Sequence, residues 1–193
     1  MKPLVPAVFA ALAVMATPAE AVTFDFERAQ NGNLFESVFA FTEGDLTVSA
    51  SSASGADLSR NQAGLGVRGG AASQRAGQGE GFVLSFNQQV ALTGALIFER
   101  RSGTDAIRVT DGAGGEAVLT TAATGGSSFV EFPLAGLTGS VFAFDVISST
   151  GSRNNSGIRL SALEVAAIPG PAGALSLATA LALAAGFKRR AKR

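Results

Sequence analysis

Residues 82–86 read Phe-Val-Leu-Ser-Phe, and residues 142–146 read Phe-Ala-Phe-Asp-Val. In both stretches a large apolar side chain occupies every second position, which is the period of a β-strand with one face turned towards a core. Similar alternation recurs between residues 24 and 165, interrupted by Gly, Ser, Asn and Asp. The pattern predicts an all-β domain of about nine or ten strands in two packed antiparallel sheets, a jelly-roll-like β-sandwich.

Three local features refine this prediction. The run Asp-Gly-Ala-Gly-Gly at 111–115, flanked by apolar alternation, predicts a β-hairpin. The stretch 49–81 is rich in Gly, Ser and Ala, and we expect it to form a long surface excursion with one short strand around residues 65–67. The twelve phenylalanines between residues 22 and 167 are expected to point inwards as core residues.

One motif in that excursion resembles a nucleotide site. Residues 64–69 read Gly-Leu-Gly-Val-Arg-Gly, which matches the glycine spacing of a dinucleotide-binding loop. Such a loop needs a strand before it and a helix after it, whose N-terminus binds the pyrophosphate. Neither the polar residues 59–63 nor the Gly- and Ala-rich residues 70–74 meet these requirements. We therefore reject a dinucleotide site.

Composition excludes many function classes for the segment 22–167. It contains 14 acidic residues and nine arginines, a net charge of −5, which does not favour binding to nucleic acid. The chain has no His and no Cys, which excludes Ser-His and Cys-His nucleophile pairs and ordinary zinc sites. Because Trp and Tyr are also absent, phenylalanine is the only aromatic platform for a sugar. The composition predicts a protein that is not an enzyme.

Both ends of the chain carry export features. Lys2 precedes an apolar run, and Ala19-Glu20-Ala21 forms an A-x-A cleavage site, so residues 1–21 are predicted to be a signal peptide. At the other end an apolar run of 16 residues extends from Ala172 to Phe187. As a helix it would reach about 24 Å, short of a hydrocarbon core of about 30 Å. We expect a single, weakly held transmembrane helix, and the alternative is a buried C-terminal helix of the domain.

The residues on either side of this run fix its interpretation. A Pro-Gly-Pro box at 169–171 precedes it, and five cations that set a cytoplasmic C-terminus follow it: Lys188, Arg189, Arg190, Lys192 and Arg193. The predicted organisation is therefore a signal peptide at 1–21, an exported domain at 22–167 and a C-terminal signal at 168–193.

This layout resembles the PEP-CTERM class of bacterial exported proteins. The variant whose box reads Val-Pro-Leu-Pro-Ala is the more similar, and the matching positions here are Ile168, Pro169, Gly170, Pro171 and Ala172. Gly170 stands where Glu or Leu is usual. The resemblance implies a Gram-negative host, passage through the secretion translocon and a temporary anchor in the inner membrane. It also implies cleavage near the box by an exosortase, a membrane cysteine protease-transpeptidase, and a final location at the cell surface or outside the cell.

Several functions of the exported domain remain open. A structural or adhesive role near exopolysaccharide in a biofilm is the first, and a carbohydrate-binding module, with or without the assistance of calcium, is the alternative. A glycan hydrolase with two carboxylates is less favoured. Calcium binds carboxylate oxygens, and four acids on the predicted first and last strands are candidates: Asp25, Glu27, Asp145 and Glu164. No other cofactor is expected. Arg100-Arg101, with Asp105 beyond them, predicts a polar strand end and turn. The alternative is that these arginines bind an acidic polysaccharide.

Overall fold

The computed structural model describes residues 20–69, 74–99, 103–122, 126–150 and 157–168. Within these ranges the chain forms twelve strands and no helix, which confirms the all-β prediction. In chain order the strands are β1 (Ala21–Asp25), β2 (Leu34–Glu36), β3 (Val38–Glu43), β4 (Leu46–Ser52), β5 (Leu58–Asn61), β6 (Gly64–Val67), β7 (Gly81–Glu99), β8 (Asp105–Asp111), β9 (Glu116–Thr120), β10 (Ser128–Pro133), β11 (Thr138–Ser149) and β12 (Ile158–Ala167).

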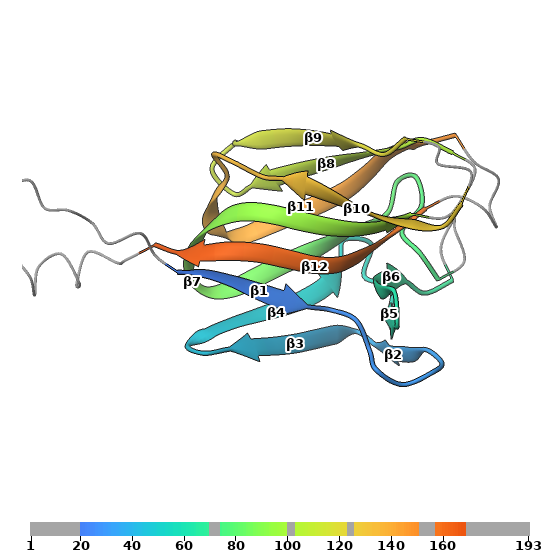
Figure 1. Cartoon of the computed structure of the whole chain (residues 1–193), viewed down its shortest axis with the longest axis horizontal. Helices are drawn as coiled ribbons and strands as arrows, with labels where there is room; N and C mark the ends of the chain where they lie inside the picture. The colour runs from blue at the N-terminus through green and yellow to red at the C-terminus, as the bar shows by residue number, and fades with distance from the viewer. Residues whose placement is uncertain (1–19, 70–73, 100–102, 123–125, 151–156, 169–193) are drawn as a thin grey trace, which may run out of the picture.

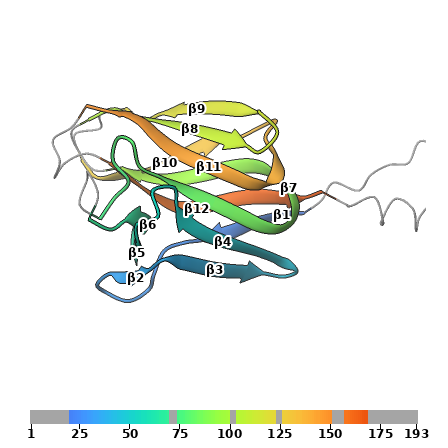
Figure 2. The same cartoon turned by 180° about the vertical axis from the view of Figure 1, so that it is seen from behind.

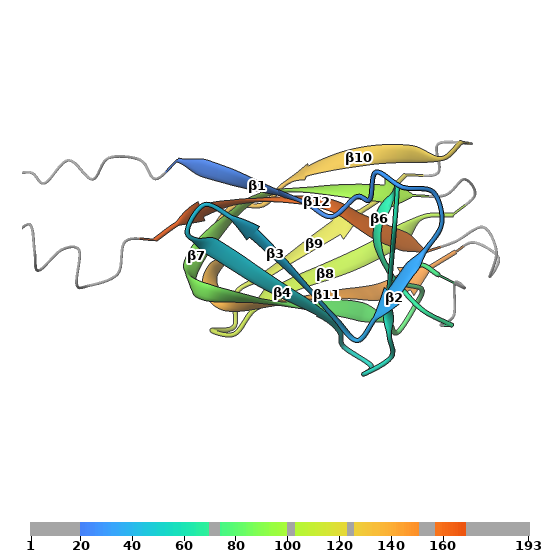
Figure 3. The same ribbon diagram turned by 90° about the horizontal axis from the view of Figure 1, so that it is seen from below.

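Strand β7 explains why one sheet forms where the sequence predicted two. It is 19 residues long, and all twelve strands are connected through it into one antiparallel sheet. Residues 81–91 pair with β11, and residues 82–86 also pair with β4. Residues 90–99 pair with β12, and residues 94–99 also pair with β10. At the exposed residues 87–89 the strand bends back on itself, so Gly81 and Glu99 lie towards the same end of the molecule and the two halves of β7 belong to two facing layers (Figure 3).

The first layer contains β3, β4, the first half of β7, β11, β8 and β9. The second contains β10, the second half of β7, β12 and β1, with β6, β5 and β2 continuing from β12. Figures 1 and 2 show β8 and β9 at one edge of the molecule, and β2 and β3 at the opposite edge. The hairpin expected at 111–115 is confirmed as the connection between β8 and β9.

Phenylalanine rings fill the space between the layers. Phe24 of the second layer packs against Phe86 of the first, with ring centroids 5.8 Å apart, and Phe86 in turn packs against Phe142 at 5.9 Å. Edge-to-face pairs at such distances are favourable beyond the burial of the rings. The prediction that all twelve phenylalanines are core residues is wrong for Phe129, which is 49% exposed on the edge strand β10, and for the half-buried Phe35 and Phe98, which lie outside the core.

The expected surface excursion at 49–81 is also wrong in part. It contains two strands, β5 and β6, and the side chains of Leu58 and Leu65 are completely buried. The hairpin packs this closely because Gly64 and Gly66 have no Cβ atom. A Cβ on Gly64 would collide with the backbone of Leu160, and one on Gly66 would collide with the backbone of Gln74. Glycine here permits close packing rather than a loop.

The two ends of the described chain lie side by side. Ala21, the first residue of β1, is the register partner of Ala166 near the end of β12. Figure 1 shows both strands leaving the domain at the same end, which we call the terminal end. The opposite end, which we call the distal end, carries the last residue of β7, the first of β8 and the last of β11, namely Glu99, Asp105 and Ser149.

Candidate functional site

Most of the predicted sorting residues lie outside the described residues. These are Ala19, Pro169, Gly170, Pro171, Ala172 and the cations from Lys188 to Arg193. Two others are described. Ala21 begins β1, and the backbone N–H of Ile168 donates a hydrogen bond to the carbonyl oxygen of Gln89 at 3.0 Å. In the part of the chain that the structure describes, no helix is long and apolar enough to span a membrane.

The four calcium candidates lie in different surroundings. The carboxylate of Asp25 accepts a hydrogen bond from the backbone N–H of Glu27 at 2.7 Å. Partial burial raises the pKa of Glu27, and the nearby Asp25 raises it further. Asp145 lies in the other layer, where it pairs with Arg108 at 3.4 Å. The structure thus brings Asp25 and Glu27 together but not the full set of four.

Glu164 lies on the outer face of the second layer. It is the register partner of Thr23, while Asp25 pairs with Ala162, so Glu164 and Asp25 are diagonal neighbours on one exposed face. Such neighbours are about 7–8 Å apart at Cα. Across residues 20–69, 74–99, 103–122, 126–150 and 157–168, no group of three or more acidic, His or Cys side chains is arranged to hold a metal.

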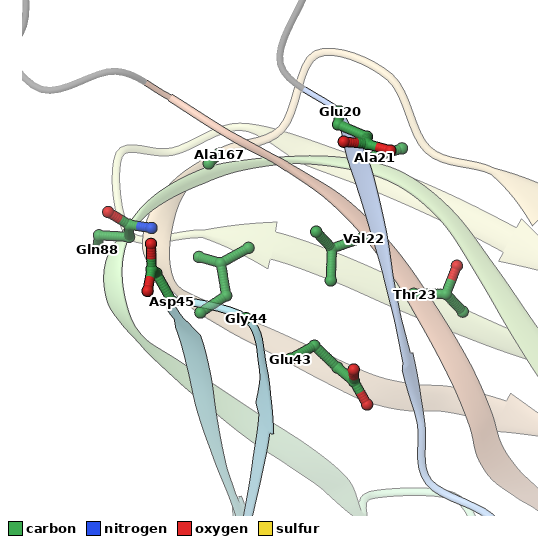
Figure 4. Close-up of a pocket in the computed structure, with 10 residues that line it drawn as sticks. Glu20, Ala21, Val22, Thr23, Glu43, Gly44, Asp45, Gln88 and Ala167 are labelled. Atoms are coloured by element: carbon green, nitrogen blue, oxygen red, sulfur yellow. The ribbon is translucent and has the colours of Figure 1, made fainter.

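A hollow of about 540 Å³ opens at the terminal end (Figure 4). Three acidic residues line it: Glu20, Glu43 and Asp45. Of its lining residues, Glu20 and Ala21 belong to the predicted signal peptide. Because cleavage before Val22 would remove part of its wall, this hollow is a poor candidate for a site in the mature protein.

A second hollow, of about 270 Å³, lies on the outer face of the second layer. It is lined by Thr93, Gly94, Glu131, Phe132, Pro133 and Glu164, which come from β7, β10 and β12. Both Pro133 and Glu164 are register partners of Gly94. Because Gly94 has no side chain, Glu164 lies over it, and a Cβ there would be 2.9 Å from Glu164 Oε2. The hollow therefore has backbone atoms at its base, and the carboxylates of Glu131 and Glu164 lie beside it.

An exposed aromatic ring lies next to this hollow. Phe129 is two residues before Glu131 on β10, so both side chains are on the outer face. Its ring packs edge-on against Phe98 with centroids 5.1 Å apart. A ring beside carboxylates suits a sugar, because the ring contacts C–H groups and the carboxylates accept hydrogen bonds from hydroxyls. We call Phe129, Glu131, Gly94 and Glu164 the outer-face site.

The same two carboxylates are poorly placed for hydrolysis. Glu131 and Glu164 lie on strands that flank β7, so their backbones are separated by two strand spacings, about 9.6 Å. They are also offset along β7, since Glu131 is opposite Leu96 whereas Glu164 is opposite Gly94, two residues away. The hollow is also partly open to solvent rather than enclosed. The arrangement favours binding over catalysis.

The sequence contained a signal for this site that the core interpretation missed. In residues 129–134 the inward positions of the stripe are the half-buried Val130 and Phe132 and the buried Leu134, so period two places Phe129 and Glu131 on the opposite face. No family model, curated protein or solved structure matches this chain. A functional assignment therefore rests on the sequence and on the geometry of the described residues.

Proposed function

We propose that this chain is an exported, non-enzymatic protein of the cell surface or extracellular matrix, with a structural or adhesive role near exopolysaccharide. In this proposal residues 1–21 are a signal peptide and residues 172–187 are a short transmembrane helix. An exosortase-type enzyme processes the box at 168–172, and the exported domain is a jelly-roll-like β-sandwich. The two facing layers support the last point.

The single observation that carries the proposal is the order of features at the C-terminus. A domain that ends in β12 at Ala167 is followed at once by the Pro-Gly-Pro box, the apolar run and the basic tail. The box cannot be helical at its prolines and would stay accessible at the membrane surface. Because β1 begins and β12 ends at the terminal end, a tail held in the membrane would leave the distal end facing outwards.

Processing is tested by expressing the full chain in two Gram-negative hosts, one with an exosortase and one without. In the first host, mass spectrometry of surface material should find an N-terminus at Val22 and C-terminal peptides ending close to Pro171. In the second, the chain should keep its basic tail and stay in the inner membrane. A variant with Pro169→Ala and Pro171→Ala should behave as in the second host. Intact chains ending in Arg193 at the surface of the first host would contradict the proposal.

A second candidate, a carbohydrate-binding module, is favoured by the outer-face site. A glycan array with the wild-type chain should then give signals that are lost with Phe129→Ala. Val118→Ala is a matched control, because Val118 is 53% exposed on β9, in the other layer. Equal signals from both variants would exclude the outer-face site. Release of reducing sugar by the wild type but not by Glu131→Gln would instead support the two-carboxylate hydrolase and overturn the non-enzymatic assignment.

A further inference from the structure

The distal end contains buried oxygen atoms without partners. Among the described residues, five buried side-chain polar atoms have no hydrogen-bond partner, and four of them are Oε1 and Oε2 of Glu99, Oδ1 of Asp105 and Oγ of Ser149. Glu99 and Asp105 are each 1% exposed. A buried carboxylate without a partner is costly, since it loses its hydration and gains nothing in return. Such a concentration at one place requires a physical explanation.

The three residues come from both layers and face the same space. Glu99 ends β7 and has the inward orientation of Ile97, two residues earlier in the second layer. Asp105 begins β8 in the first layer and has the inward orientation of Ile107. Asp105 and Ser149 are register partners, so their Cβ atoms are about 4.5–5.5 Å apart on one face of the sheet. The carboxylates thus approach each other across the end of the core.

Electrostatics shows that the two acids interact unfavourably. Burial raises the pKa of the Glu99 carboxyl, the Thr121 hydroxyl lowers it in part, and the neighbouring Asp105 carboxylate raises it again. The Thr121 hydroxyl is engaged by Asp105, since it accepts a hydrogen bond from the backbone N–H of Asp105 at 2.9 Å and donates one to the carbonyl oxygen of Asp105 at 3.3 Å. Two ion pairs of the described residues lie away from this place, between Arg68 and Asp57 and between Arg108 and Asp145.

We propose that Glu99, Asp105 and Ser149 bind one calcium ion that joins the two layers at the distal end of the domain. A hard cation with oxygen ligands fits this set, because calcium accepts bidentate and monodentate carboxylates, hydroxyls, backbone carbonyls and water in flexible geometry. A soft metal does not fit, because the chain has neither His nor Cys. The site is distinct from the acids Asp25, Glu27, Asp145 and Glu164, and it does not depend on the proposed function.

With two carboxylates and a neutral hydroxyl the site has little ligand charge, so affinity is expected in the range of extracellular modules, a Kd of about 10⁻⁴–10⁻³ M. The test is calorimetric titration of the full chain, stripped with EDTA and held in mild detergent, with CaCl₂. One calcium should bind per chain. Glu99→Gln and Asp105→Asn should each weaken binding by about tenfold or more, since carboxylate count sets calcium affinity. Glu116→Gln, at an exposed position of β9 outside both sites, should bind like the wild type.

Thermal unfolding gives a second readout of the same variants. In EDTA, Glu99→Gln should melt above the wild type, because it removes a buried charge that Asp105 repels. In saturating calcium the order should reverse. The proposal is overturned if the wild type binds no calcium up to about 10 mM, well above the expected Kd. It is equally overturned if binding is lost with Asp25→Ala or Asp145→Ala but not with Asp105→Asn. If Glu99→Gln fails to fold, the calcium titrations of the wild type and of Asp105→Asn still test the proposal.

Discussion

The guanidinium of Arg159 donates a hydrogen bond from Nη1 to the carbonyl oxygen of Gly64, at 3.0 Å. The same nitrogen donates to the carbonyl oxygen of Ser59 at 3.3 Å. Arg159 is 4% exposed, and burial lowers its pKa to about 10, with a further lowering by Arg75. A buried cation thus connects β12 to the β5–β6 hairpin through backbone carbonyls.

Arg159→Leu should lower the free energy of unfolding by about 1–3 kcal/mol, because the buried carbonyls of Ser59 and Gly64 would lose a donor. Arg68→Leu is the matched control. Arg68 pairs with Asp57 at 3.0 Å and lies over the ring of Phe35, but the side chains of the ion pair are about half-exposed, so its loss should cost only about 1 kcal/mol. Urea unfolding followed by far-UV circular dichroism measures both. Equal effects would show that the Arg159 contacts do not stabilise the hairpin.

Gly66→Ala should destabilise the domain strongly, because the new Cβ would collide with the backbone of Gln74, which cannot move as a side chain can. Overpacking of this kind costs about 1–3 kcal/mol or more. Gly112→Ala is a suitable control, since a Cβ there meets nothing within 4 Å. Thermal unfolding should separate the two variants by several degrees. If Gly66→Ala and Gly112→Ala unfold at the same temperature, the hairpin is not packed as tightly as described.

Asp111 should make stability depend on pH. Its carboxylate accepts hydrogen bonds from the backbone N–H groups of Gly115 at 2.7 Å, Ala113 at 2.9 Å and Thr138 at 3.4 Å, and the bond from Gly115 is the main cause of its lowered pKa. A lowered folded pKa gives stability that is present above the ordinary value of 3.8 and is lost as pH falls below it.

Asp111→Asn should therefore unfold more easily than the wild type at neutral pH, and the difference should shrink as pH falls through about 4. Asparagine keeps an acceptor oxygen in the turn, so the hairpin itself is retained. Denaturant titrations at a series of pH values measure the difference. A gap that stays constant from neutral to strongly acidic pH would show that the charge of Asp111 contributes nothing.

Deletion of residues 172–193 should leave a folded and exported protein that is never held in the membrane. The reason is that β12 ends at Ala167 and the last described backbone hydrogen bond is that of Ile168. Circular dichroism of the truncated chain and its recovery from the periplasm check the two halves of this expectation. Aggregation or loss of β signal would show that the tail belongs to the folded domain.

The alternation of apolar and polar residues was sufficient to predict many of the strands, but it did not predict which strands pair with each other. The alternation in 82–86 and 142–146 predicted strands that the structure contains, and the 111–115 turn was predicted from its residues alone. The burial of 64–67 was not predictable, because Leu65 pairs with Leu160, far away in the sequence, and glycine composition by itself indicates a loop.

The outer-face site and the proposed calcium site also differ in how far the sequence predicts them. Phe129 and Glu131 share a face by simple period two, so that part of the outer-face site was within reach of sequence reasoning. The approach of Asp105 to Ser149 was not, because a register shift between Val146 and Ser148 changes which residues of β11 face inwards. Irregularities of this kind depend on pairing between strands and leave no clear mark in one strand's sequence.

Strand β12 has a mechanical consequence. It lies between β7 and β1, runs from Ile158 at the distal end to Ala167 at the terminal end, and its backbone bonds are perpendicular to its length. If the chain is held beyond Ile168 and a load is attached at the distal end, the force acts along the strand. All its bonds are then sheared at once instead of being opened one after another. The domain should therefore resist stretching most along the axis that a tether at its C-terminus would pull.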